Sequence, residues 1–361
     1  MTKASSAVQT GQLAYAFHGV GYRLESDYLP LVNFARRLLD SLFEPSLDYA
    51  GASSLPVKVL ARLHWNASLP FPGLEGERVR QWGRRLWQAD HRVLLSELPF
   101  FPGLQLDVQW LEDRLKIDAY YRPASWRDRA GLRLGQIRER IFNSLIYILV
   151  YFPLIHFLER TRGWQLLHSA AVYASVGDRP EDSVLLSGLP GSGKTTLSLA
   201  LLDVPQARLL SDNLLLAGEQ RVYACPENLH VSDQSLSLLP AGARARLTAA
   251  GRKLTYNRQD HRLPPADRCD EGIPRALFFI GLSDRLDCQP LPNPLALERF
   301  VAGNGLAREV QAYRLFSDSL DLISPQQDSS GSRMKTLQAF FSHLSCYELW
   351  LERDAPLEAA V

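Results

Sequence analysis

Apolar positions in the first 135 residues follow two different periods. Residues 28–43 place apolar side chains three and four positions apart, which predicts an amphipathic helix that begins near Pro30. Four later segments alternate or run apolar as strands do: 57–63, 93–98, 104–110 and 115–121. A helix among several strands predicts an N-terminal α+β domain over residues 1–135.

An uncharged run at residues 141–158 has the minimum length of a membrane span. Four residues make it a poor one: Asn143, Ser144, Pro153 and His156. Basic residues also flank both of its ends, whereas a span usually carries its positive excess on one side. We therefore expect a helix that is buried in the protein and no membrane span.

From residue 162 onward the pattern changes to strand, glycine loop, helix, strand. The expected strands are 166–174, 183–187, 207–211, 276–282 and 346–351, and the expected helices are 195–202, 294–302 and 332–344. The segment 256–270 is polar and arginine-rich with two prolines, so we expect a loop there. The alternation predicts an α/β domain over residues 136–361.

The charge balance argues against nucleic acid as a partner. The chain has 40 basic and 39 acidic residues, a formal net charge of +1, so it has no global positive field to hold a polyanion. Only six of the basic residues are lysines, which makes the position of each lysine informative.

The cysteines and the N-terminus bear on the compartment. Four cysteines with no C-x-x-C pair predict reduced thiols rather than a zinc site or a disulfide framework. The first residues, MTKASSAVQTGQ, have no apolar core, so no signal peptide is expected. Both features favour a cytoplasmic protein.

Residues 188–195, GLPGSGKT, match the phosphate-binding pattern G-x-x-x-x-G-K-[ST] in full, between an expected strand and an expected helix. The glycines let backbone N–H groups converge on an anion at a helix N-terminus. Lys194 supplies positive charge to the outer phosphates, and the Thr195 hydroxyl suits Mg²⁺. We predict binding of ATP or another nucleoside triphosphate with Mg²⁺ through Gly188, Pro190, Gly191, Ser192, Gly193, Lys194, Thr195 and Thr196.

Polar residues near the neighbouring strands complete the candidate site. Asp212 and Asn213 follow the strand 207–211, where a carboxylate can hold magnesium or accept the proton of an attacking hydroxyl. Glu227 and His230 come soon afterwards, and for them the metal, the acceptor and the protein surface all stay open. His168 is expected at the start of a strand, where a lone histidine is usually structural.

The ordered segments LLHSAAVY, VLLSGLPGSGKTTLSLALL and RLLSDN resemble the catalytic domain of HPr kinase/phosphorylase and related kinases of bacterial peptide-modification clusters. The resemblance covers roughly residues 137–356. ATP-dependent phosphoenolpyruvate carboxykinases are more distant and share a similar phosphate loop. The order and spacing of His168, Lys194 and Asp212 indicate the family, since the loop alone indicates only a nucleotide. The resemblance implies a mixed-sheet P-loop kinase core of the HPr kinase/phosphoenolpyruvate carboxykinase-like type.

The resemblance also implies roles for three catalytic residues. Asp212 matches the family aspartate that acts as general base toward the acceptor hydroxyl. His168 matches an active-site histidine, and Lys194 matches the phosphate-loop lysine.

For the metal, the resemblance implies Thr195 and Asp212, with Asn213 and Glu227 as further candidates. The family often has a second acid where this chain has Asn213, which can ligate but carries no charge. No counterpart of the E-I-R-G-L-G segment, which is linked to dephosphorylation, is present. We therefore expect a kinase without phosphorylase activity.

The sequence leaves the acceptor open. The first hypothesis is transfer of the γ-phosphate of ATP to a serine or threonine of a peptide or protein. A small-molecule hydroxyl kinase and a nucleotide-dependent switch protein without phosphotransfer remain alternatives. The charged residues of 252–268 form either a solvated loop or a lid over the site. Relatives often form oligomers, so a homo-oligomer is a further expectation.

Overall fold

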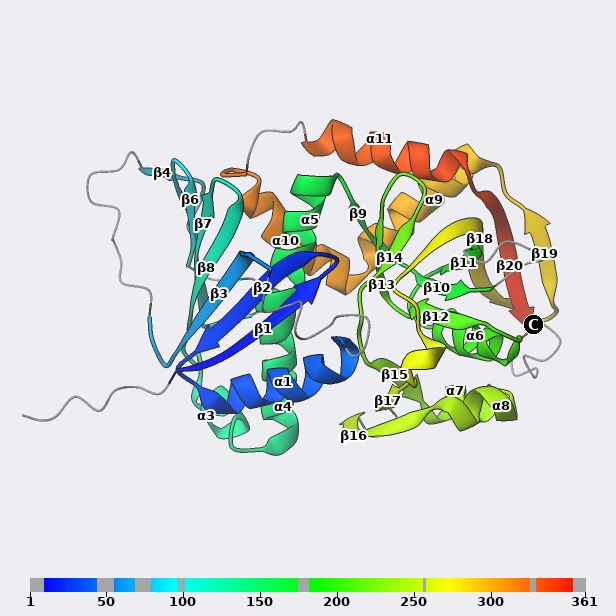
Figure 1. The fold of residues 1–361 in the computed structure, drawn as a ribbon, viewed down its shortest axis with the longest axis horizontal. Helices are drawn as coiled ribbons and strands as arrows, with labels where there is room; N and C mark the ends of the chain where they lie inside the picture. Colours follow the sequence, from blue (N-terminus) through cyan, green and yellow to red (C-terminus); the bar gives the residue numbers. More distant parts are fainter. Residues whose placement is uncertain are drawn as a thin grey trace, which may run out of the picture. The chain divides into compact units, whose positions relative to one another are not determined.

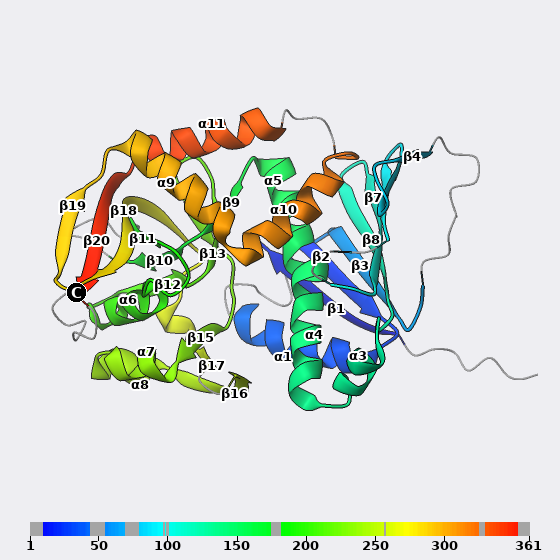
Figure 2. The same cartoon turned by 180° about the vertical axis from the view of Figure 1, so that it is seen from behind.

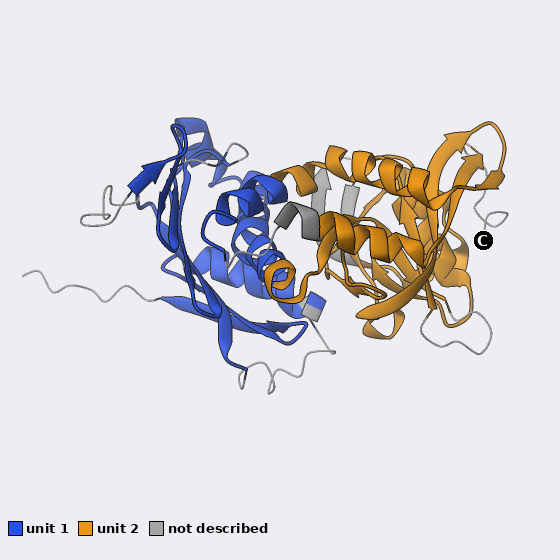
Figure 3. Cartoon of the chain, turned by 90° about the horizontal axis from the view of Figure 1, so that it is seen from above, with its two compact units in different colours: residues 1–157, 313–326 blue, residues 158–312, 327–361 orange. Residues whose placement is uncertain are grey.

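A computed structural model describes residues 10–43, 55–68, 79–96, 98, 101–174, 182–255, 258–324 and 329–352. The chain divides into two compact units: Met1–Phe157 with Tyr313–Gln326, and Leu158–Ala312 with Gln327–Val361 (Figure 3). This division differs from the predicted boundary after residue 135. Residues 136–157 and the late segment 313–326 belong with the N-terminal unit.

The first unit contains an eight-stranded sheet in the order β1-β2-β3-β8-β7-β6-β5-β4 (Figure 1). Its strands are β1 Gly11–Phe17, β2 Val20–Ser26, β3 Val57–Trp65, β4 Val79–Gln81, β5 Leu86–Ala89, β6 Arg92–Leu95, β7 Leu104–Leu111 and β8 Arg114–Tyr121. The pairs β2–β3 and β3–β8 are parallel, and the others are antiparallel. The helix predicted at 28–43 is α1, Leu29–Phe43, and the four predicted strands of this region correspond to β3, β6, β7 and β8.

Tight turns join several of these strands. In the β1–β2 hairpin, Phe17 pairs with Val20, so the loop has only two residues, His18 and Gly19. Both have positive φ, 46° and 76°, as a type I′ turn requires. The strands β1 and β2 were not predicted, although this turn matches the right-handed twist of the strands that flank it.

The uncharged segment forms one continuous helix in three parts: α4 Gly135–Ile146, a π-helical turn Tyr147–Tyr151, and α5 Phe152–Arg162. The π turn stands before Pro153, whose ring lacks an N–H and would clash in a regular helix. The helix has the length and composition of a span, but 78% of its most apolar window is buried. Within the first unit, Phe142 packs edge-on against Phe34 and Trp65, and the Tyr22 hydroxyl donates to the Leu149 carbonyl at 2.9 Å. The prediction of a buried helix is confirmed.

The second unit is built on a nine-stranded mixed sheet. Seven strands follow the order β12-β10-β11-β18-β14-β13-β9, and β20 pairs with β18 and with the edge strand β19. The bounds are β9 Gln165–His168, β10 Ala170–Tyr173, β11 Asp182–Ser187, β12 Arg208–Ser211, β13 Leu214–Ala217, β14 Val222–Ala224, β18 Glu271–Ser283, β19 Asp287–Pro290 and β20 Ser345–Glu352. The pairs β11–β18 and β18–β20 are parallel. The predicted α/β class with a mixed sheet is confirmed.

Two hydrophobic clusters cover opposite faces of this sheet, because successive side chains of a strand point to opposite sides. Along β10, Ala171 and Tyr173 belong to the cluster with α9 Asn293–Leu306 and α11 Ser329–Ser342. Ala170 and Val172 belong to the cluster with α6 Lys194–Ala200. Figure 2 shows α9 and α11 on one side of these strands and α6 on the other.

The prediction of one strand over residues 166–174 is wrong, because Ser169 divides the segment into β9 and β10. The two strands are five steps apart in the sheet order. Five steps in a flat sheet span roughly 24 Å, whereas a single linking residue spans only about 7 Å. The sheet must therefore curl strongly, which brings β9 back toward β10.

The remaining elements include a small sheet that was predicted as a loop. Its order is β15-β17-β16, with bounds β15 Leu229–Ser232, β16 Thr248–Thr255 and β17 Arg258–Arg262. The predicted loop 256–270 is thus wrong for Arg258–Arg262, which pairs with strands on both sides. The other helices are α3 Trp126–Gly131, α7 Asp233–Leu238, α8 Ala241–Arg246 and α10 Arg308–Leu320, with short 3₁₀ turns at Leu201–Asp203 and Pro265–Asp267.

Candidate active site

The glycine-rich loop connects the end of β11 to the first residue of α6, Lys194. Gly188, Gly191 and Gly193 have φ values of 154°, 84° and 96°, which side chains with a Cβ rarely adopt. A Cβ at Gly188 would lie 2.6 Å from Ser192 Oγ and 2.8 Å from the Ile280 carbonyl oxygen. Glycine is therefore required there both for conformation and for space.

Lys194 is buried, with 8% of its surface exposed. Its ammonium donates to the carbonyl oxygens of Gly188 at 2.7 Å and Leu189 at 3.2 Å. Burial lowers the pKa of this amine, while the charges of Asp212 and Glu309 act in the opposite direction. The contacts hold the cation at the loop and leave one of its three N–H donors for another partner.

Asp212 follows β12 and lies at the start of α6. The Thr195 hydroxyl donates to Asp212 Oδ2 at 3.1 Å, and the Ser198 hydroxyl reaches Oδ1 at 3.4 Å. Burial raises the pKa of Asp212, and the hydrogen bond from Thr195 and the charges of His230 and Lys194 oppose that rise. A carboxylate whose proton affinity is raised, beside a phosphate-loop hydroxyl, is suited to accept a proton.

Asn213 and Glu227 are also brought together. The Asn213 amide donates from Nδ2 to Glu227 Oε2 at 3.0 Å. Both line the same pocket as Asp212, and so does His230 of β15. The structure thus places all three of these residues inside the site rather than elsewhere on the protein surface.

His168 is the last residue of β9, not the start of a strand, and 7% of its surface is exposed. Burial and the nearby Lys194 lower its pKa to about 4, against the influence of Glu309 and a hydrogen bond with Asn213. Its backbone N–H donates to Asn304 Oδ1 at 2.7 Å. The imidazole is therefore a fixed, neutral group at the wall of the site near neutral pH.

These residues share one pocket of about 820 Å³. Six of the eight candidates for nucleotide binding line it, and so do all six candidates for catalysis or metal binding. Together they are His168, Pro190, Gly191, Gly193, Lys194, Thr195, Thr196, Asp212, Asn213 and Glu227. Gly188 and Ser192 are not part of the lining. These two residues lie close to each other within the loop.

Several pocket residues were missed by the sequence analysis. Arg308 and Glu309 start α10 and line the pocket more than a hundred residues after the loop. No local sequence pattern predicts that these two residues belong to the pocket. Ser235 accepts a hydrogen bond from the Thr196 hydroxyl at 3.1 Å. The helix cap formed by Ser232, three residues before Ser235, is the sequence signal that could have predicted the start of α7.

The residues fit a magnesium nucleotide better than an all-protein metal centre. Within the described residues, no cluster of three or more His, Cys, Asp or Glu side chains forms a metal site. Mg²⁺ instead takes one or two protein oxygens together with phosphate oxygens and water, and Thr195 and Asp212 supply two adjacent oxygens. The lining also contains a buried polar atom without a protein partner, Asn228 Oδ1.

The end of the arginine-rich segment does not contribute to this pocket. Residues 261–268, the part of the segment whose side chains the structure describes, are not among those that line it. The segment is largely β16 and β17 of the small sheet, so the lid interpretation gains no support from these residues.

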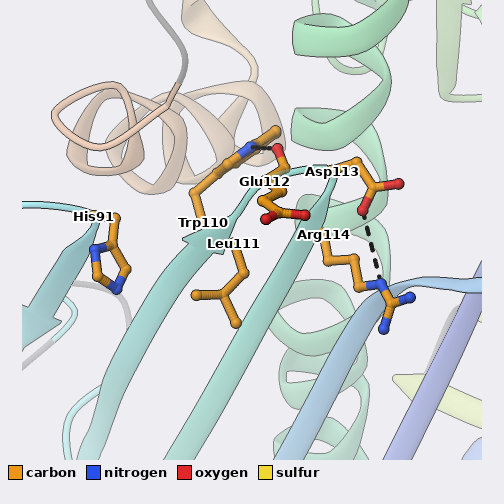
Figure 4. Close-up of a pocket in the computed structure, with 6 residues that line it drawn as sticks. All are labelled: His91, Trp110, Leu111, Glu112, Asp113 and Arg114. Carbon is orange, nitrogen blue, oxygen red and sulfur yellow. Dashed lines mark hydrogen bonds and ion pairs between the residues drawn. The ribbon is translucent and has the colours of Figure 1, made fainter.

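A second pocket, of about 570 Å³, lies in the first unit at the β7–β8 turn (Figure 4). The Trp110 indole donates to the Glu112 carbonyl at 3.1 Å, and Asp113 pairs with Arg114 at 3.7 Å and with Lys58. The Trp110 indole and the charges of Asp113 and Arg114 therefore already have partners within the protein. His91 also lines this pocket.

No family model matches the chain, and no curated protein matches it.

Proposed function

We propose that the chain is an ATP-dependent kinase that transfers the γ-phosphate to a hydroxyl group. The observation that carries the proposal is the hydrogen bond between Thr195 and Asp212, 3.1 Å long, at the mouth of a complete phosphate loop. A phosphate loop alone is compatible with any nucleotide-binding protein. A buried carboxylate of raised pKa beside it is compatible with a base for a second substrate.

Each group then has a physical role. The loop N–H groups and Lys194 bind and orient the phosphates, and Lys194 compensates charge that develops during transfer. Thr195 and Asp212 would hold Mg²⁺, which supplies positive charge at the phosphate oxygens when bound. A free oxygen lone pair of Asp212 takes the proton of the attacking hydroxyl.

The acceptor class comes from the resemblance to HPr kinase-like enzymes, which favours serine or threonine of a peptide or protein. The absence of a segment like E-I-R-G-L-G favours transfer without the reverse dephosphorylation. Free thiols at Cys225, Cys269, Cys288 and Cys346 fit a cytoplasmic location. A small-molecule hydroxyl acceptor and a switch without transfer are separated from this proposal by the assay below.

The decisive experiment is the Asp212→Asn variant, assayed for nucleotide binding and for phosphate transfer separately. We expect transfer to fall by about 10²–10⁴-fold, because a general base is lost, with the affinity for nucleotide measured in the absence of Mg²⁺ nearly unchanged. Asp284→Asn, at an exposed position in the same unit, is the matched control and should retain both activities. Loss of binding and transfer to the same extent would contradict the role of Asp212.

The acceptor is tested by mass spectrometry after incubation with ATP and Mg²⁺. Serine- and threonine-containing peptides encoded nearby in the genome are offered beside small hydroxyl compounds. A phosphorylated peptide supports the proposal in full, and a phosphorylated small molecule supports the alternative acceptor. Nucleotide hydrolysis without any phosphorylated product would favour the switch protein.

A further inference from the structure

An exposed apolar and basic surface lies in the first unit, where α3 turns into α4. Three large apolar side chains face solvent there: Trp126 is 69% exposed, Leu134 59% and Ile137 42%. Three arginines between them, Arg127, Arg129 and Arg133, are exposed as well. We call these six residues the α3–α4 surface.

The backbone of this surface is fixed by local hydrogen bonds. Ser125 and Asp128 form a capping box at the start of α3, with Asp128 Oδ2 accepting from the Ser125 backbone N–H at 2.9 Å. After α3, the N–H of Leu132 donates to the Asp128 carbonyl and that of Leu134 to the Gly131 carbonyl, both at 2.9 Å. The exposed side chains are therefore presented by an ordered turn.

Close packing at Gly131 joins the two helices of the surface. A Cβ at Gly131 would lie 2.6 Å from Ile137 Cγ2, so only glycine lets α3 approach α4 this closely. Trp126 and Arg129 are three residues apart within α3, which places them on the same side of that helix. Figure 1 shows α3 beside the start of α4.

The charge of the surface is not neutralised by its neighbours. Arg127, Arg129 and Arg133 take part in no ion pair with another described residue. The Arg127 guanidinium lies 5.6 Å from the centre of the Trp126 ring, a cation–π contact that leaves the charge in place. The single acid between them, Asp128, is engaged in the capping box.

We propose that the α3–α4 surface binds the face of a bilayer that contains anionic phospholipid. Exposed tryptophan and aliphatic side chains among cations match the layered chemistry of that interface. The rings and alkyl groups enter the acyl boundary, and the guanidinium groups bind lipid phosphates. The six residues line neither of the two pockets described above, and the grooves that bind peptide side chains are usually apolar pockets of that kind.

Vesicle flotation with the full chain tests the proposal, with vesicles of phosphatidylcholine alone and with added phosphatidylglycerol. We expect the wild type to bind the anionic vesicles and to be released by high salt. Trp126→Ala should weaken binding at least tenfold. The triple variant R127Q/R129Q/R133Q should weaken it further, by about fivefold for each lost arginine.

Matched control variants distinguish binding through the α3–α4 surface from effects of the total charge and hydrophobicity of the protein. Trp82 is 52% exposed elsewhere in the same unit, so Trp82→Ala removes an equivalent ring. The variant R36Q/R80Q/R84Q removes the same charge from other exposed positions. Both should bind as the wild type does, and circular dichroism should show all variants folded.

Four outcomes would overturn the proposal. They are failure of the wild type to bind anionic vesicles, equal binding to both vesicle types, equal loss in control and surface variants, and binding to a polyglutamate peptide but not to vesicles. The last result would assign the surface to an acidic protein partner instead. Because none of these variants touches the nucleotide pocket, the outcome is independent of the kinase proposal.

Discussion

At the scale of single residues, the pocket contains ionisable groups whose surroundings favour their neutral forms. Burial shifts the pKa of Lys194 down and that of Asp212 up, and it lowers the pKa of His168 to about 4. Each shift reflects the free-energy cost of keeping the charged form of the group away from water. A bound ligand of opposite charge would stabilise the charged form and reduce that shift.

The lowered pKa of His168 predicts that the free energy of unfolding depends on pH. The unfolded state binds the His168 proton near pH 6.5, but the folded state binds it only near pH 4, so the unfolded state holds more protons between these values. The free energy of unfolding should therefore rise as the pH increases from about 4 to 6.5. The contribution of His168 to stability is lost as the pH falls through the same range. The shift corresponds to about 3 kcal/mol.

Urea unfolding at pH 4.5 and pH 7, without nucleotide or magnesium, checks this prediction. Carboxyl groups also contribute, so the comparison is between the wild type and His168→Gln, which should show a weaker pH dependence. His343→Gln, at an exposed position, serves as the control. An unchanged pH dependence in His168→Gln would show that the imidazole is not held neutral.

The residues of the site differ in how far the sequence could predict them. Lys194, Thr195 and Asp212 lie on consecutive elements of one motif, so their order along the chain predicts their meeting. Arg308 and Glu309 reach the pocket only because α10 begins beside it. A local sequence pattern cannot predict a contact between residues that are so far apart in the chain.

At the scale of elements, predictions succeeded where periodicity and burial agree. The helix α1 and the strands β7 and β8 have apolar faces that one period describes. The break at Ser169 was missed because the residues on both sides are buried, which makes β9 and β10 look like one apolar run. The strand β17 was missed because its residues are polar and its partners lie in the same small sheet.

The phosphate loop allows a prediction about backbone geometry. Gly188→Ala combines a positive φ with a Cβ only 2.8 Å from the Ile280 backbone carbonyl, so we expect a loss of about 1–3 kcal/mol in unfolding free energy and weaker nucleotide binding. Gly191→Ala has the same kind of φ, but no atom lies within 4 Å of its Cβ. It should lose only about 1 kcal/mol.

Chemical unfolding and nucleotide titration of the two alanine variants make the comparison. Both variants have a positive φ, so the difference between them reports mainly the steric contacts of the Gly188 Cβ with Ser192 and Ile280. Equal losses would mean that the close approach of the loop to β18 does not matter.

At the scale of the whole molecule, each unit has its own core, and the boundary between them does not follow the chain. Residues 313–326 join the first unit through the Phe316 ring against Phe152 and through Ser317 and Ser324, which hydrogen-bond to the two ring nitrogens of the buried His156. These partners are about 160 residues apart in the sequence. The predicted boundary after residue 135 relied on a change of pattern and could not detect such a return.

Binding of nucleotide at one pocket should stabilise the folded chain as a whole by mass action. With Mg²⁺ and ATP at 100 times the dissociation constant, we expect about 2.7 kcal/mol of added stability in the wild type. Lys194→Ala should lose most of this gain, because the loop then lacks its positive charge.

Thermal unfolding with and without magnesium nucleotide measures the gain. Lys335→Ala removes an exposed lysine of α11 and should behave as the wild type does. An undiminished gain in Lys194→Ala would argue against the phosphate loop as the binding site.

The ends of the two sheets have a consequence for aggregation. An exposed strand edge is a template on which another chain can add a strand. The edge strand β19 of the second unit is only four residues long, begins with Asp287 and ends with Pro290, which has no N–H to offer to an added strand. The edge strand β4 of the first unit has three residues and carries Arg80 at its centre. These two edges, among those of the two sheets, are thus too short, and too charged or too poor in donors, to serve as templates for an added strand.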